Sequence, residues 1–139
     1  MSDVEPSRGA PVLVAAAVIR EDRGSQVLLT RRPDRGHLAG FWEFPGGKVE
    51  PGEPPEVAVV RECEEEIALR VRVIDILEVT FHRYPMKDVL LLFYDCRVVD
   101  GEIEHREVAE HAWVHPDELA RYELPPPDAR LVHKLRAGG

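Results

Sequence analysis

Two apolar runs near the start of the chain each have the length of a β-strand. They cover 11–19 and 26–30, and a polar stretch that contains Gly24 separates them. Because apolar runs joined by a short turn are typical of a β-hairpin, we expect these two strands to pair with each other. A shorter apolar run at 41–44 is expected to form a third strand that ends at Pro45-Gly46-Gly47.

The rest of the chain alternates between strand-like and helix-like periodicity. The other expected strands are 70–81, 89–99 and 111–114, and the expected helices are 55–67, 116–121 and 128–136. Strands with helices between and after them are typical of a layered α/β domain.

The helix expected at 55–67 carries an acidic side. A rotation of about 100° per residue puts Val57, Val59, Val60, Cys63 and Ile67 on one side, and Ala58, Arg61, Glu62, Glu65 and Glu66 on the other. Glu62, Glu65 and Glu66 stand at positions i, i+3 and i+4, so their carboxylates are neighbours and repel by a few tenths of a kcal/mol per pair. Such a face is often only solvated, but clustered carboxylates are also the ligands that Mg²⁺ prefers.

Composition narrows the classes of function. The chain has 139 residues, 44% apolar and 32% charged, which fits one soluble domain. The net charge of −8 argues against electrostatic binding to nucleic acid. An anionic substrate would need a metal ion or placed Arg and Lys side chains to neutralise it.

Few features of the sequence indicate the cellular compartment of the protein. Cys63 and Cys96 lack the spacing of a metal site and are expected to be buried in the protein core. A reducing compartment is therefore expected. No apolar run is long enough for a membrane span, and no signal-peptide pattern is present, so we expect a cytoplasmic protein without a membrane partner. Residues 1–9 are expected to form a flexible N-terminal tail.

The residues before the acidic helix strengthen the metal interpretation. Gly46-Gly47-Lys48 opens a glycine-rich loop, and glycines let the backbone approach a ligand closely. Lys48 can reach a phosphate, and Glu53 stands where the helix dipole favours a carboxylate.

The stretch 46–69 resembles the Nudix box, Gly-x5-Glu-x7-Arg-Glu-U-x-Glu-Glu-x-Gly-U, where U is a bulky aliphatic residue. The matching residues are Gly47, Glu53, Arg61, Glu62, Glu65, Glu66 and Leu69. Cys63 replaces an aliphatic residue, and Ala68 replaces glycine, which costs roughly 1–2 kcal/mol if the backbone there is left-handed. Within the Nudix hydrolases the chain is most similar to the MutT-type enzymes, through Leu29–Arg32, His37, Phe41–Lys48 and Leu124–Asp128.

This resemblance implies an α/β/α sandwich around a mixed β-sheet, formed by a single domain over residues 1–139. It also implies Mg²⁺, or alternatively Mn²⁺, held by the Gly46 carbonyl, Glu62 and Glu66, with Glu65 as a ligand or water-orienting group. Arg61 would form an ion pair with Glu53, and Arg32, His37 and Lys48 would bind phosphates. A further acidic ligand is expected beyond the box, for which Glu107 aligns best and Glu104 and Glu110 are alternatives.

The implied reaction is hydrolysis of a nucleoside triphosphate to monophosphate and pyrophosphate. The resemblance puts a base-reading residue at Asp128, although an Asp after prolines also suits the N-cap of a helix. An ionised Asp128 would suit a cytosine-type triphosphate and a protonated one would suit oxidised deoxyguanosine triphosphate. Of the two, the cytosine-type triphosphate is favoured by a small margin. Alternative substrates are ADP-ribose and a dinucleoside polyphosphate. The alternative of another class is a non-catalytic nucleotide-sensing module. The oligomeric state is left open.

Overall fold

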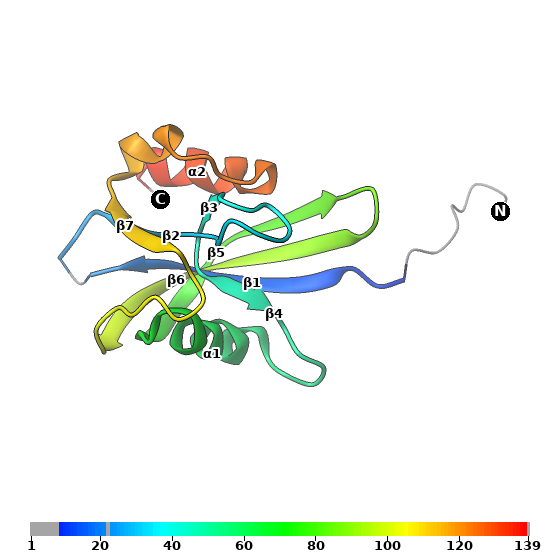
Figure 1. Ribbon diagram of the computed structural model, residues 1–139, viewed down its shortest axis with the longest axis horizontal. Helices are drawn as coiled ribbons and strands as arrows, with labels where there is room; N and C mark the ends of the chain where they lie inside the picture. Colours follow the sequence, from blue (N-terminus) through cyan, green and yellow to red (C-terminus); the bar gives the residue numbers. More distant parts are fainter. Residues whose placement is uncertain (1–8, 22, 139) are drawn as a thin grey trace, which may run out of the picture.

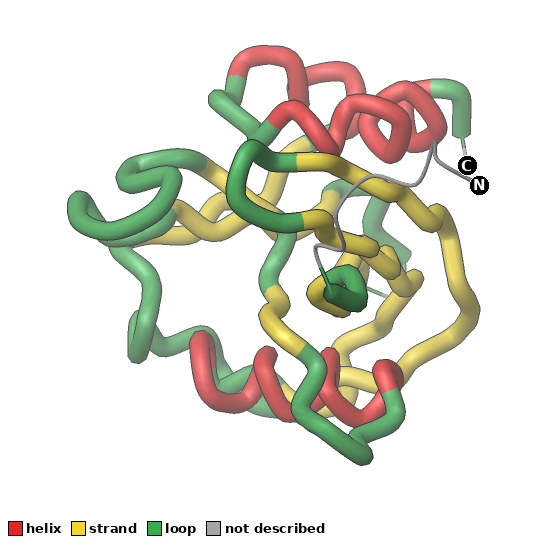
Figure 2. The backbone as a smooth tube through the Cα atoms, turned by 90° about the vertical axis from the view of Figure 1, so that its right-hand side faces the viewer, coloured by secondary structure: helices red, strands yellow, loops and turns green. Residues whose placement is uncertain are grey.

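The helices form two outer layers around the strands. The computed structural model describes residues 9–21 and 23–138, so the expected tail lies outside the described residues except for Gly9. Helix α1 (Pro55–Ile67) lies on one side of the strands (Figure 1). Helix α2 (Ala129–Arg136) and the 3-10 helices η1 (Pro116–Arg121) and η2 (Pro126–Asp128) lie on the other. Figure 2 shows the strands between these layers, as expected for an α/β/α sandwich. None of the described helices could cross a bilayer.

The strands form two sheets rather than one. The first is a mixed sheet in the order β4-β1-β6-β5, in which only β1 and β6 are parallel neighbours. Its strands are β1 (Val12–Arg20), β4 (Gly46–Lys48), β5 (Arg70–Arg83) and β6 (Asp88–Asp100). The second is antiparallel, in the order β3-β2-β7, with β2 (Val27–Arg31), β3 (Trp42–Glu43) and β7 (Glu110–Val114).

Strand β1 lies at the centre and separates two cores. Ala15, Ala17 and Ile19 pack in the core that α1 covers, and Ala16 and Val18 pack in the core that α2 covers. A strand buried on both faces reads as a continuous apolar run rather than an alternating one. This burial explains the uninterrupted run at the start of the chain.

The expected hairpin between the first two strands is wrong. One edge of β1 pairs with β6 from Val12 to Arg20 and the other pairs with β4 at Val14–Ala16, so β1 has a neighbour on each side. Strand β2 instead joins β3 and β7 in the other sheet. The expected helix at 116–121 is a 3-10 helix, and the last helix begins at Ala129, after a separate 3-10 turn.

The end of α1 is fixed by the loop that follows β6. Glu104 donates its backbone N–H to the Ile67 carbonyl at 2.9 Å, and Arg106 and Glu107 both donate theirs to the Glu66 carbonyl at 3.1 Å. The last carbonyls of a helix lack partners within it, and this loop supplies them. The same bonds hold Glu107 beside the end of α1.

Ala68 adopts the left-handed conformation that the sequence pattern suggested, with φ of 60°. We expect Ala68→Gly to stabilise the protein by about 1 kcal/mol, because glycine adopts this conformation without the Cβ penalty. This change corresponds to a rise of about 3 °C in Tm, with turnover little altered. Thermal unfolding checks it, and a clear loss of stability would show that the Ala68 methyl contributes more by packing than the strain costs.

Candidate active site

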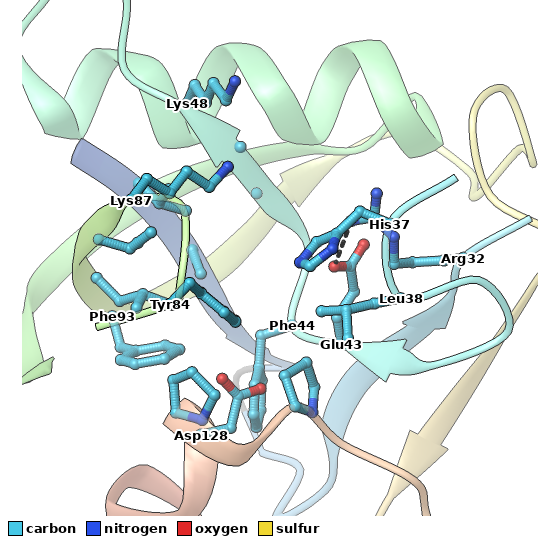
Figure 3. Close-up of a pocket in the computed structure, with 18 residues that line it drawn as sticks. Arg32, His37, Leu38, Glu43, Phe44, Lys48, Tyr84, Lys87, Phe93 and Asp128 are labelled. Carbon is cyan, nitrogen blue, oxygen red and sulfur yellow. Dashed lines mark hydrogen bonds and ion pairs between the residues drawn. The ribbon is translucent and has the colours of Figure 1, made fainter. Parts of the chain in front are cut away.

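A cavity of about 340 Å³ lies between strands β4 and β6, the loop that joins β2 to β3, and the prolines that precede α2. Figure 3 shows Lys48 and Lys87 at one end of it and Asp128 at the other. Gly46 and Gly47 line the cavity, together with Arg32, His37, Leu38, Glu43, Phe44, Tyr84, Phe93, Pro125 and Pro127. All four residues expected to bind substrate, Arg32, His37, Lys48 and Asp128, are among the lining residues.

The two glycines of β4 permit close approaches on opposite sides. A Cβ atom on Gly46 would lie 2.2 Å from the Ala15 carbonyl oxygen of β1. A Cβ atom on Gly47 would lie 2.5 Å from the Glu62 carboxyl carbon on α1. The glycine pair therefore lets the strand lie against β1 while the Glu62 carboxylate reaches over it.

Arg61 connects the helix to the preceding loop. Its Nε and Nη2 atoms donate to the two carboxylate oxygens of Glu53, at 2.8 and 3.0 Å. Its Nη1 donates to Glu62 at 3.0 Å and to Glu65 at 3.1 Å, and its Nη2 reaches the Lys48 carbonyl at 3.2 Å. Hydrogen bonds from Arg61 lower the pKa of Glu53, and Glu53 and Glu62 raise the pKa of Arg61. The expected Arg61–Glu53 ion pair is thus present.

Glu66 is the buried acid of the site, with 7% of its surface exposed. Burial raises its pKa well above the ordinary range, and a hydrogen bond with Glu62 and the charges of Glu43, Glu62 and Glu107 add to the effect. A smaller cavity of about 150 Å³, which we call the acidic cavity, lies beside it and is lined by Arg32, Pro33, Glu43, Gly46, Glu66 and Glu107. Closely spaced acids around a buried carboxyl such as Glu66 are stabilised by a cation.

The donor set fits a hard divalent cation. It consists of carboxylates and the Gly46 carbonyl, the oxygen ligands that Mg²⁺ prefers. In the described part of the chain, however, no three acidic, histidine or cysteine side chains converge to hold an ion by themselves. Glu62 and Glu65 are turned toward Arg61. Because Mg²⁺ keeps several waters and shares substrate oxygens, it does not need a closed protein cage.

The three alternatives for the downstream acid are separated in space. Glu107 lines the small cavity with Glu66 and Gly46. Glu104 lies by Ala68 and Arg70 in a different hollow, and Glu110 accepts a hydrogen bond from Arg31 Nε at 2.6 Å. Only Glu107 is near the expected ligands.

Asp128 lies at the far end of the large cavity and is 4% exposed. Its side chain makes no capping hydrogen bond to α2, although it stands at the N-cap position. Figure 3 shows its carboxylate pointing into the cavity. Burial, and then the charge of Glu43, raise the pKa of Asp128 to about 7.

Sequence reasoning missed Glu43 and Lys87. Glu43 accepts a hydrogen bond from Arg32 Nη1 at 3.2 Å and borders both cavities. Its one sequence signal is an acid inside the apolar run 41–44. Lys87 carried no signal, because its position depends on how the turn between β5 and β6 folds over the cavity. Tyr84 of the same turn donates its N–H to the Lys87 carbonyl at 2.9 Å.

We expect Gly47→Ala to lower kcat/KM by about 10²-fold, because a misplacement of about 1 Å at a reacting group costs this much. The new methyl would displace the Glu62 carboxylate, which is the flexible end of a side chain, so Tm should change little. Gly24→Ala is the matched control, since its Cβ would meet only ordinary contacts of 3.5 Å or more. Steady-state kinetics check this, and activity within twofold of the parent protein would show that Glu62 need not stay where it is.

Comparisons with known proteins agree with this geometry. The family model described as NUDIX domain matches residues 11–135. The chain is 40% identical to the 8-oxo-dGTP diphosphatase of Haemophilus influenzae over 124 residues, covering 89% of this chain and 90% of that protein. It is 34% identical to the CTP pyrophosphohydrolase of Escherichia coli over 126 residues, covering 89% and 90%.

A solved structure shows the same fold. The MutT protein from Methanosarcina mazei Go1 superposes with a TM-score of 0.81 at 28% identity, covering 92% of this chain and 95% of that one. The family match spans most of the chain, and Glu66 of the box lines the acidic cavity beside Gly46. The chain therefore belongs to the Nudix family of hydrolases.

Proposed function

We propose that the protein is a Mg²⁺-dependent nucleoside triphosphate pyrophosphohydrolase that prefers a triphosphate with an oxidised guanine. The observation that carries the choice of base is Asp128, a buried acid that faces the cavity and does not cap its helix. Relatives named 8-oxo-dGTP diphosphatase support the same class of substrate. Residues 1–139 would act as a single catalytic domain.

The two ends of the cavity suit the two ends of a nucleotide. Its volume of about 340 Å³ lies within the usual range of about 300–1,000 Å³ for small-molecule sites. Phe44, Phe93 and the prolines near Asp128 offer apolar walls for a base. Lys48 and Lys87 at the other end offer cations for phosphates, and Arg32 offers a planar fork that can pair with two phosphate oxygens.

The protonation of Asp128 explains a preference for oxidised over ordinary guanine. A carboxyl with a pKa of about 7 is neutral in a large share of molecules at neutral pH, and it then both donates and accepts hydrogen bonds. 8-Oxoguanine presents an O6 acceptor beside an N7–H donor, which matches this pair. Guanine presents two acceptors there, so one polar group would stay unpaired, and an unpaired buried group is costly.

The acidic cavity would hold the metal ion. The Gly46 carbonyl, Glu62 and Glu66 would be ligands, with Glu65 or Glu107 completing the set, and Mn²⁺ could replace Mg²⁺. A bound divalent ion supplies charge neutralisation for the phosphates and lowers the pKa of a water. Arg61 keeps the loop and helix in a fixed relation through its bonds to Glu53, Glu62 and Glu65.

In the proposed reaction, water attacks a phosphorus atom of the triphosphate. The bond to the bridging oxygen breaks, and the monophosphate and pyrophosphate leave as separate products. A carboxylate of the cluster orients the attacking water or accepts its proton. Phosphoryl transfer depends mainly on positioning and charge stabilisation, which a rigid helix with several carboxylates provides.

A cytosine nucleotide is the second candidate. The ionised form of Asp128 only accepts hydrogen bonds and would suit the exocyclic amine of cytosine. The relative named CTP pyrophosphohydrolase supports this candidate. No feature of the cavity favours ADP-ribose or a dinucleoside polyphosphate.

A substrate panel tests the proposal directly. It contains 8-oxo-dGTP, dGTP, CTP, dCTP, ADP-ribose and diadenosine tetraphosphate, each with and without Mg²⁺, with product identification. We expect Mg²⁺-dependent release of monophosphate and pyrophosphate, with kcat/KM at least about tenfold higher for 8-oxo-dGTP than for dGTP. A preference for cytosine nucleotides would favour the second candidate, and binding without turnover would indicate a nucleotide-sensing module.

A further inference from the structure

Leu38 has an unusual backbone conformation for a bulky residue. Its φ is 56°, and in the described part of the chain only Leu38 and Ala68 have a positive φ without being glycine. The left-handed region is costly for a residue with a Cβ atom. Such strain persists only when the surroundings impose it, and it gathers at ligand sites.

The loop that contains Leu38 is closed by three backbone hydrogen bonds. Arg32 N–H donates to the Phe41 carbonyl at 2.9 Å, Phe41 N–H to the Leu38 carbonyl at 3.0 Å, and Gly40 N–H to the Pro33 carbonyl at 3.3 Å. Gly36 and Gly40 of this loop also have a positive φ, 87° and 76°. The loop thus contains glycine at two left-handed positions and a leucine at the third.

The strained backbone directs the Leu38 side chain to the cavity. Leu38 is half-buried and lines the cavity. Figure 3 shows it on the opposite side from Tyr84 and Phe93, with Asp128 below. The neighbouring His37 meets Tyr84 edge-on, with ring centroids 5.6 Å apart, so the two sides of the cavity are in contact through these rings. Leu38 offers an apolar group on one side, and Tyr84 and Phe93 offer aromatic rings on the other, which suits a flat ring between them.

We propose that Leu38 is a specificity-determining residue whose left-handed backbone presents its side chain to one face of the nucleotide base. Asp128 would read the edge of that base, and Leu38 would fix the plane in which the edge is read. This inference rests on the proposed function, because it requires a base beside Asp128.

The test compares Leu38→Ala with Leu38→Gly, and uses Ala68→Gly as a matched control. Both Leu38 variants lose the apolar face, so KM for the best triphosphate should rise about tenfold with kcat within about twofold. Only the glycine variant also loses the backbone strain, so its Tm should exceed that of Leu38→Ala by about 3 °C. Ala68→Gly should show a similar rise in Tm with KM unchanged, because Ala68 lies outside the cavity.

Direct binding separates this inference from the proposed function. Calorimetry should show a dissociation constant for 8-oxo-dGMP about tenfold weaker in both Leu38 variants, with binding of pyrophosphate unchanged. KM and nucleotide affinity within twofold of the parent protein would overturn the inference, as would an equal loss of pyrophosphate affinity or a glycine variant no more stable than the alanine one. A parent protein that binds the monophosphate but hydrolyses no triphosphate would overturn the proposed function alone.

Discussion

Glu62→Gln and Glu66→Gln should each lower kcat/KM by about 10²–10³-fold, the order of loss when a group that stabilises transition-state charge is removed. Glutamine has nearly the same shape as glutamate but carries no charge, so it is a weak ligand for a hard cation. Glu62 lies against Gly47, and Glu66 lines the acidic cavity with Gly46. Both changes remove charge from the site and keep its volume.

Kinetics over a range of Mg²⁺ concentrations measure the effect, and circular dichroism confirms an intact fold. Glu64→Gln is the matched control, because Glu64 stands on the same helix but is exposed and lies outside the acidic cavity. It should keep nearly full activity. Full turnover by Glu62→Gln or Glu66→Gln would overturn the ligand assignment for that residue.

The same Glu66 variant should behave differently in stability. Burial raises the pKa of Glu66 in the folded protein above its ordinary 4.5. The folded state then holds the proton more tightly than the unfolded state, so rising pH above about 4.5 costs stability in the metal-free protein. Glu66→Gln removes this cost, and its metal-free form should melt above the parent protein at pH 8. A lower melting temperature would show that the Glu66 carboxylate has a stabilising partner in the fold.

The Nudix box could be recognised from the sequence because its residues lie close together along the chain. Arg61 and Glu53 stand close in sequence, on a helix and on the loop before it, and the resemblance to the Nudix box implied the ion pair that the structure contains. The helix at 55–67 has the bounds that its periodicity predicted. The left-handed turn at Ala68 also follows from position, since it ends that helix.

The helix faces were predicted less well. Val57 is 53% exposed, whereas Ala58 is fully buried and Glu66 nearly so. The helix is rotated relative to the apolar pattern, because Ala58 packs closely in the core with Ala15 and Ala17 of β1. A small side chain next to small side chains permits this close contact, and the rotation buries Glu66 at the small cavity. Hydrophobicity alone gives no measure of such close packing.

Long-range pairing was the part that the sequence could not supply. Strand β1 pairs in parallel with β6, from Val12 opposite Val89 to Arg20 opposite Arg97. No local pattern encodes a partner about 77 residues away, whereas a short turn always suggests a hairpin. Glu43 and Lys87 were missed for the same reason, since the cavity exists only after β3 and the β5–β6 turn are brought together.

Replacing Asp128 should change which base the enzyme accepts. Asp128→Ala should lower kcat/KM for the best substrate by at least about 10²-fold and leave poor substrates nearly unchanged, because only a base that satisfies the buried group loses its bonds. Asp128→Asn should keep the oxidised guanine substrate, since an amide always offers one donor side and one acceptor side. Steady-state kinetics with 8-oxo-dGTP, dGTP and CTP measure both effects.

The pH dependence gives the sharper distinction between the two candidate bases. With a pKa of about 7, Asp128 is neutral below this pH and charged above it. If the neutral form reads 8-oxoguanine, the ratio of kcat/KM between the parent protein and Asp128→Asn falls as pH rises through 7, because only the parent loses its donor. Other ionisations at the metal site affect both proteins and cancel in the ratio. If the charged form reads cytosine, the same ratio measured with CTP rises over this range.

A ratio independent of pH for both substrates, together with an equal loss across all bases in Asp128→Ala, would mean that Asp128 only supports the start of α2. The choice of base would then lose its structural basis.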